Sequence, residues 1–185
     1  MNSIFDRLLR WLRCKKVIRH IPKDSVVCDI GCGGKCLFLK NISNLIKKGI
    51  GFDEEAEDYA DLKLEIKKYQ ISELIPLKDE SCDIVTMMAV LEHLSKPQEI
   101  LNESWRILRN GGKLILTTPT PFARPLLEFL AFKLKIIDKE EIRDHKNYFG
   151  EGNIGRMLLA AGFKKENINN YFFEFRLNSL IIAEK

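Results

Sequence analysis

The chain has 185 residues, a length at which one domain can bury a hydrophobic core without disulfide bonds. Its 45% hydrophobic and 30% charged residues are typical of a globular protein and exclude a disordered chain. No stretch approaches the roughly 20 apolar residues that a membrane-spanning helix needs, and the charged N-terminus does not resemble a signal peptide. Five cysteines, an odd number, favour reduced thiols and a cytoplasmic location.

The net charge of +4 is concentrated at the N-terminus. Residues 1–23 contain seven Lys or Arg and one Asp, whereas the rest of the chain has 23 basic and 25 acidic residues. We therefore expect no nucleic-acid-binding face. Within this segment apolar residues recur at helical spacing between the basic ones, which predicts a basic amphipathic helix that ends before Pro22.

Strand and helix patterns alternate along the rest of the chain. In order, we expect a strand at 25–30, a helix at about 35–48, strands at 48–53, 62–69 and 82–90, a helix at 96–108, a strand at 111–119, a helix at 150–163 and closing strands at 171–175 and 178–185. This alternation predicts a single α/β domain with an open, mostly parallel sheet and helices on both faces. Ligands of such sheets bind at the carboxyl ends of the strands.

The first strand leads into the stretch CDIGCGGKC, residues 28–36. Its three evenly spaced cysteines raise the possibility of an iron–sulfur site, but Cys28 lies in the strand, Cys32 in the turn and Cys36 at the start of the helix. Bringing all three to one metal would break the strand–turn–helix geometry, and most clusters need a fourth thiolate. We predict no metal here and interpret the cysteines as small buried residues.

The glycines of this stretch favour a ligand-binding turn, because they let the backbone approach a ligand and aim free N–H groups at it. A phosphate-binding P-loop and a dinucleotide fingerprint both fail at Cys36, where they require Ser or Thr and Gly, respectively. Asp29, two residues before Gly31, suits a ligand with an amine and repels a pyrophosphate. The turn therefore favours an amine-bearing ligand.

Four motifs in register carry a resemblance to a known family. VVCDIGCGG, Asp53 in GIGFD, CDIVTMMAVLEHL and NGGKLILTTPTP follow one another over residues 20–120. Together they resemble the class I S-adenosylmethionine-dependent methyltransferases, and more narrowly the methyltransferase type 11 group. The resemblance implies a Rossmann-like seven-stranded sheet with an antiparallel last strand, and S-adenosyl-L-methionine as cofactor, with S-adenosyl-L-homocysteine as product.

The resemblance also implies roles for the first two motifs. The backbone of Gly31, Cys32, Gly33 and Gly34 would pass under the methionine part of the cofactor, and Asp29 would reach its ammonium. Asp53, with Glu54 beside it, would accept hydrogen bonds from the ribose hydroxyls. The alternative for Asp53 is a capping role in the turn that follows it.

Later positions complete the implied cofactor site. Gln70 and Ile71 would lie beside the adenine, although Gln70 can equally be a surface residue. Met88 and Ala89 would lie against the cofactor, with a backbone carbonyl accepting a hydrogen bond from its ammonium. The alternative for the methionines is core filling.

Two histidines are candidate general bases for the acceptor. His93 lies in Leu-Glu-His, where quinone-biosynthesis O-methyltransferases carry the metal-binding motif E-x-x-E-H. Ala89 replaces the first Glu of that motif, so we predict no metal. His93 is either a base or a structural residue at a helix start, and His145 is the second candidate.

The acceptor side is predicted from two segments. Residues 119–148 form an insert or lid, and 119–138 are rich in Phe and Leu; the N-terminal helix, residues 1–23, would close the other side. They favour a small-molecule acceptor that is apolar or lipid-linked, and they could meet a membrane surface. Alternatively, both segments bury their apolar faces in the core. We predict a methyltransferase; the alternative is a non-catalytic protein that kept the fold.

Overall fold

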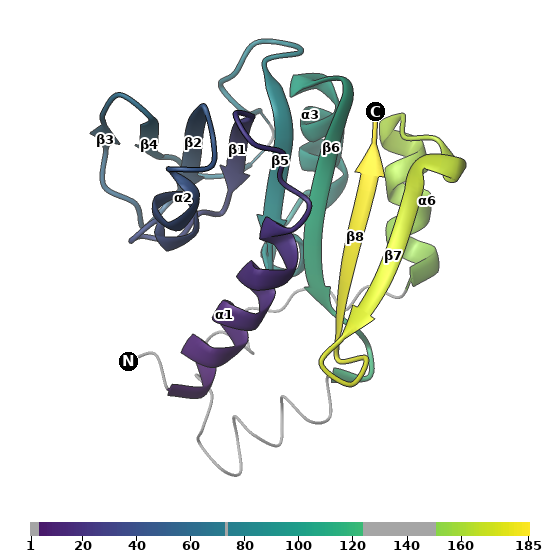
Figure 1. Cartoon of the computed structure of the whole chain (residues 1–185). Helices are drawn as coiled ribbons and strands as arrows, with labels where there is room; N and C mark the ends of the chain where they lie inside the picture. The colour runs from purple at the N-terminus through teal and green to yellow at the C-terminus, as the bar shows by residue number, and fades with distance from the viewer. Residues whose placement is uncertain (1–3, 73, 124–150) are drawn as a thin grey trace.

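The computed structural model describes residues 4–72, 74–123 and 151–185, whose strands form one eight-stranded sheet (Figure 1). The strand order is β3-β4-β2-β1-β5-β6-β8-β7. The strands are β1 (Val26–Ile30), β2 (Lys48–Asp53), β3 (Tyr59–Ala60), β4 (Leu64–Lys68), β5 (Cys82–Met88), β6 (Leu108–Pro119), β7 (Ile168–Phe173) and β8 (Asn178–Glu184). The helices are α1 (Ile4–Ile18), α2 (Leu37–Ile42), α3 (Pro97–Ile107) and α6 (Glu151–Ala161), with short 3-10 turns η1 (Leu91–His93) and η3 (Lys165–Asn167).

The centre of the sheet is parallel, with β1 between β2 and β5. These strands are buried along nearly their whole length because helices cover both of their faces. β8, the last strand, runs antiparallel between β6 and β7, which confirms the predicted antiparallel last strand. The eighth strand is the two-residue β3, an antiparallel addition at the edge beside β4 that the sequence did not predict.

Two hydrophobic cores lie on opposite faces of the sheet. Successive residues of β6 alternate between them: Leu114 and Leu116 pack on the side of α3 and α6, and Ile115 packs on the side of α1 and α2. Figure 1 shows the same layering, with α1 and α2 in front of the sheet and α3 and α6 behind it. Burying each large aliphatic side chain contributes about 1.5–3 kcal/mol, so the helix-on-both-faces arrangement stabilises the whole sheet.

Several predicted elements differ in extent from the observed ones, among them a helix and a closing strand. The helix expected over 35–48 stops at Ile42, because the chain then bonds to the strand approach: Asp24 N donates to Leu45 O, and Lys47 N to Ser25 O. The strand expected over 171–175 begins at residue 168 and ends at Phe173. It ends there because residues 174–176 all adopt left-handed backbone conformations and form the turn into β8.

Candidate functional site

The turn after β1 lies at the carboxyl end of the strand, next to the loop after β5. Gly31 has φ +76°, and a Cβ there would lie 2.3 Å from Cγ2 of Val90. Gly34 contacts the loop after β2, since a Cβ there would lie 2.9 Å from the carbonyl oxygen of Glu55. At Gly33, with φ +72°, a Cβ would meet nothing within 4 Å. Glycine is therefore required at Gly31 and Gly34, where the backbone packs against the loops after β5 and β2, whereas the backbone at Gly33 faces open space.

The first three N–H groups of this turn are not free, contrary to the expectation from sequence. Gly31 N and Cys32 N donate to Phe52 O at 2.8 and 3.2 Å, and Gly33 N donates to Oδ2 of Asp53 at 2.8 Å. The cause is the parallel pairing of β1 with β2, which continues past the end of β1 into the turn. The turn therefore offers a ligand a shaped backbone surface rather than a set of unpaired donors.

Asp29 is buried at the carboxyl end of β1, with 1% of its surface exposed. Its Oδ1 accepts a hydrogen bond from the Thr86 hydroxyl of β5 at 2.5 Å, and its Oδ2 has no hydrogen-bond partner. Burial raises the pKa of Asp29 to about 7; the charge of Asp53 adds to the rise and the Thr86 hydroxyl opposes it. A buried carboxylate with one unpartnered oxygen is suited to an ammonium group, which fits the methionine end of the cofactor.

Asp53 lies at the carboxyl end of β2 and is partly exposed. Its Oδ2 accepts from Gly33 N and its Oδ1 from Glu55 N at 2.9 Å, so the turn-capping role is present in the structure. An ionised carboxylate has about four acceptor positions, and two remain for hydroxyl donors. Glu54, next in the chain, is exposed. Asp53 therefore joins the β1 and β2 turns and keeps the capacity to bind a ribose.

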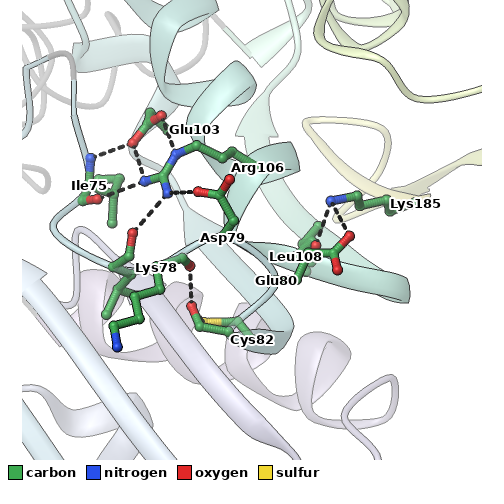
Figure 2. A network of polar contacts seen from close by, with 11 residues as sticks. Ile75, Lys78, Asp79, Glu80, Cys82, Glu103, Arg106, Leu108 and Lys185 are labelled. Carbon is green, nitrogen blue, oxygen red and sulfur yellow. Dashed lines mark hydrogen bonds and ion pairs between the residues drawn. The ribbon is translucent and has the colours of Figure 1, made fainter.

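Gln70 and Ile71 follow β4 at the same edge of the sheet. Ile71 is half-buried against the core, and Gln70 is exposed. The chain after them is fastened to α3 by Arg106, whose guanidinium donates to Ile75 O and Leu77 O and pairs with Glu103 and Asp79 (Figure 2). This network holds residues 75–81 against the helix, and so anchors the segment that follows Gln70 and Ile71.

Met88 and Ala89 end β5 beside the glycine turn. Met88 is half-buried, whereas Met87 lies wholly in the core, as the core-filling alternative expects of a methionine. Ala89 has φ +56°, and its N–H donates to Thr117 O of β6 at 2.9 Å. The predicted strand over 82–90 therefore ends two residues early, because this left-handed residue redirects the chain toward η1.

η1 carries His93, the one of the two predicted candidate bases that the structure describes. His93 is half-buried there, and its backbone N–H donates to Val90 O. His145, with the part of the 119–148 insert beyond residue 123, lies outside the described residues. Among the described residues, no group of three or more His, Cys, Asp or Glu side chains is placed to hold a metal ion. All five cysteines are free thiols; the Sγ atoms of Cys32 and Cys36 lie 3.3 Å apart.

Sequence reasoning missed Glu92, the neighbour of His93. Its side chain is 1% exposed, its Oε2 accepts from the Thr118 hydroxyl at 3.3 Å, and its Oε1 has no partner. Burial raises the pKa of Glu92 to about 7, although its own backbone N–H, the charge of Arg13 and Thr118 oppose the rise. The sequence offered two signals, its match to the second Glu of the E-x-x-E-H motif and its place shortly after β5, but neither shows that the Glu points inward.

The unpartnered buried atoms share one region of the fold. Within the described part of the chain they belong to Asp29, Glu92, Thr117 and Glu174, which all lie at or near the carboxyl ends of β1, β5, β6 and β7. A separate cavity of about 530 Å³ opens where β7 begins and β8 ends, away from the carboxyl ends of the parallel strands. Arg19, His20, Lys113 and Tyr171 are among its lining residues, and none of the site residues is. Buried polar atoms without partners mark places where a ligand can complete the hydrogen bonding.

Comparison with known proteins agrees with this geometry. A family model described as "Methyltransferase domain" matches residues 28–116. A probable S-adenosylmethionine-dependent methyltransferase of Mycolicibacterium smegmatis is 27% identical over 163 residues, 78% of this chain; the chain spans 62% of that relative's length. An uncharacterised protein of Methanocaldococcus jannaschii is 35% identical over 164 residues, which cover 84% of this chain and 72% of the relative.

Two further likenesses concern an enzyme of known reaction and a solved structure. A ubiquinone biosynthesis O-methyltransferase of Xanthomonas axonopodis is 24% identical over 83% of this chain and 68% of its own length. The crystal structure of a methyltransferase from Archaeoglobus fulgidus, described as dependent on S-adenosylmethionine, superposes with a TM-score of 0.75 at 20% identity, covering 97% of this chain and 94% of that one. By its motifs, its strand order and these likenesses, the chain belongs to the class I S-adenosylmethionine-dependent methyltransferase family.

Proposed function

We propose that this protein transfers a methyl group from S-adenosylmethionine to a small-molecule acceptor. The observation that carries the proposal is Asp29, a buried carboxyl with an unpartnered oxygen, set beside a glycine turn that Asp53 braces. The three features converge at the carboxyl ends of β1 and β2, the place where open α/β sheets bind ligands. Asp29 would bind the ammonium of the cofactor, the glycine turn its methionine chain, and Asp53 its ribose.

The cofactor would be held by residues from four strand ends. Asp29 would pair with its ammonium, Asp53 and Glu54 would accept from the ribose hydroxyls, and the backbone of residues 31–34 would pass under the methionine part. Gln70 and Ile71 would border the adenine, and Met88 and Ala89 would close the site from β5. We propose these roles because each residue lies at the carboxyl end of its strand, with Ile71 and Met88 half-buried.

Bound S-adenosylmethionine supplies a methyl group that its sulfonium has already activated. The task of the protein is then to align that methyl with the acceptor and to exclude water. Proximity and orientation alone can lower such a barrier by about 7–11 kcal/mol. A base is needed only for an acceptor that must lose a proton. For that role we propose His93 or His145, and Glu92 is a third candidate because it is buried with one unpartnered oxygen.

We further propose that the acceptor is apolar or lipid-linked and that the protein contacts a membrane peripherally. The likeness to a ubiquinone biosynthesis O-methyltransferase supports such an acceptor, and the basic helix α1 supports such a contact. No helix in the described ranges is long and apolar enough to cross a membrane. The five free thiols favour a cytoplasmic location.

An assay of methyl transfer tests the proposed activity. The protein is incubated with S-adenosylmethionine tritiated in its methyl group and a panel of phenols, catechols and amines, each with and without a prenyl tail. We expect label in one acceptor class, and loss of that activity in Asp53→Asn. Asp61→Asn is the matched control, because Asp61 also accepts two backbone N–H groups in a turn but lies at the β3–β4 edge. Cofactor binding without transfer to any acceptor would instead support the non-catalytic alternative.

A further inference from the structure

We propose that one end of the molecule docks on a bilayer that contains anionic phospholipid. The docking surface consists of the exposed side of α1, the turn after β6 and the tip of the β7–β8 hairpin. Its apolar side chains are Leu8, Trp11, Phe122 and Phe175, and its basic ones are Arg7, Lys15 and Arg176. Lipid binding at this surface does not depend on methyl transfer, but it deepens the proposed function by naming where an apolar acceptor would be met.

The hairpin tip presents an aromatic ring directly to solvent. Phe175 is 99% exposed, and it stands between Glu174 and Arg176 in a run of three left-handed residues, with φ of 50°, 54° and 68°. Left-handed backbone is unfavourable for any residue with a Cβ, and Phe gains nothing from full exposure to water. The conformation is held by Leu177 N donating to Glu174 O and by Asn178 Nδ2 donating to Glu174 Oε2. The fold thus keeps a strained turn whose outward side chain is apolar.

A second exposed ring lies on the adjoining turn. Phe122 follows β6 and is 76% exposed. Its turn is bonded to the hairpin: Thr120 N donates to Leu177 O at 2.9 Å, and Thr120 Oγ1 donates to Arg176 O at 2.7 Å. Phe122 and Phe175 therefore stand on two turns that are hydrogen-bonded to each other, at the carboxyl ends of β6 and β7.

α1 contributes apolar and basic side chains on the same end. Leu8 and Trp11 are 49% and 55% exposed, and the ammonium of Lys15 lies 4.9 Å from the Trp11 ring centre. The helix joins the core near its C-terminal end, through Val17 with Cys14 and Ile18 packed beside it, and neither Leu8 nor Trp11 belongs to that core. Figure 1 shows the N-terminal end of α1 and the tip of the β7–β8 hairpin at the same end of the molecule. Burial raises the pKa of Glu174, and the hydrogen bond from Asn178 and the charge of Arg13 in α1 oppose the rise, so the helix lies near the hairpin.

Charge complementarity identifies the occupant. Helix α1 carries five basic residues against one acidic residue, and the hairpin adds Arg176, whose guanidinium lies 4.5 Å from the Phe172 ring centre. Exposed aromatic and aliphatic side chains set among Arg and Lys match the two layers of a bilayer interface, which are acyl chains and anionic headgroups. The carboxyl ends of β1 and β2, where the proposed cofactor site lies, belong to the same edge of the sheet. A docked molecule would therefore turn its site toward the membrane.

Vesicle flotation tests the surface. Wild-type protein is mixed with vesicles of phosphatidylcholine alone or with 30% phosphatidylglycerol, at low and high salt. We expect binding to the anionic vesicles only, weakened by salt. Phe175→Asn and Phe122→Ser should each weaken vesicle binding about tenfold. Asn is chosen at position 175 because it tolerates a left-handed φ. Leu62→Ser is the matched control, because Leu62 is equally exposed, at 101%, but lies beside β3; its binding should equal wild type.

Three results would overturn the proposal. The first is an absence of binding to anionic vesicles, and the second is a loss of vesicle binding in Leu62→Ser equal to that in Phe175→Asn. The third is a dimer that forms without lipid in sedimentation velocity and dissociates in Phe175→Asn, which would assign the surface to a second copy. Titration with S-adenosylhomocysteine separates this proposal from the proposed function. Intact cofactor binding without vesicle binding refutes the surface alone, and vesicle binding without cofactor binding refutes the methyltransferase alone.

Discussion

Binding of S-adenosylhomocysteine should release a proton from Asp29. In the free protein burial raises the pKa of this carboxyl to about 7, so roughly nine-tenths of it is protonated at pH 6. The ammonium of the ligand favours the ionised form, which lowers the pKa in the complex. Because the ligand binds the ionised form, its affinity should fall as the pH falls below 7, by up to about 50-fold between pH 7 and pH 5. Above pH 7 the affinity should rise by only about a further twofold and be level from about pH 8.

Calorimetric titration at pH 6, in two buffers with different ionisation enthalpies, measures the released proton directly. The wild type should release about 0.9 proton per ligand bound. Asp29→Asn should bind more weakly, release none and show a flat pH dependence. Glu92→Gln is the matched control, because it removes the other buried carboxyl with a pKa of about 7 and should leave the release unchanged. A proton release that persists in Asp29→Asn would refute the assignment of Asp29 to the ammonium.

Three further predictions concern stability. The pKa of Glu92 is raised in the folded state, so the free energy of unfolding should fall as pH rises from 4.5 to 7 and then level off. Thermal unfolding should show that Glu92→Gln removes about 3 kcal/mol of this fall. An unchanged profile in the variant would contradict the prediction. In urea unfolding, Gly33→Ala should lower the free energy of unfolding by about 1–2 kcal/mol, from backbone strain alone. Gly31→Ala should lower it further, because a Cβ at Gly31 also meets Val90. Equal losses in the two variants would contradict the packing argument. Arg106→Lys should lower the free energy of unfolding by about 1.5–3 kcal/mol, since Lys cannot bond Ile75 O, Leu77 O, Glu103 and Asp79 together. A loss below about 0.5 kcal/mol, the size expected for one exposed ion pair, would contradict it.

The sequence predicted the architecture because its signals are local. Buried parallel strands are apolar runs bounded by Gly or charged residues, and β1, β2 and β5 all begin within one residue of their predicted starts. The early end of α2 was not predictable, because it depends on bonds from residues 45–47 to residues 24–25, far back in the chain. The same is true of β7, whose end is set by three left-handed residues of types that rarely adopt that conformation.

The candidate site was predictable in its residues but not in its hydrogen bonds. The motif spacing places Asp29 and Asp53 at neighbouring strand ends, as the structure shows. That Gly33 N donates to Asp53, rather than to a ligand, follows from the pairing of β1 with β2 and from no local pattern. The burial of Glu92 and its contact with Thr118 likewise depend on how η1 folds back over β6. Both findings needed the tertiary structure.

The central claim, that the site holds S-adenosylmethionine, is tested most directly by calorimetric titration of the purified protein. S-adenosylmethionine, S-adenosylhomocysteine and NAD are titrated into wild type, Asp53→Asn and the control Asp61→Asn. The account predicts that the first two ligands bind to wild type and to the control, that Asp53→Asn binds them at least about tenfold more weakly, and that NAD does not bind. Binding of NAD, or no binding of either sulfur compound to the folded wild type, would contradict it.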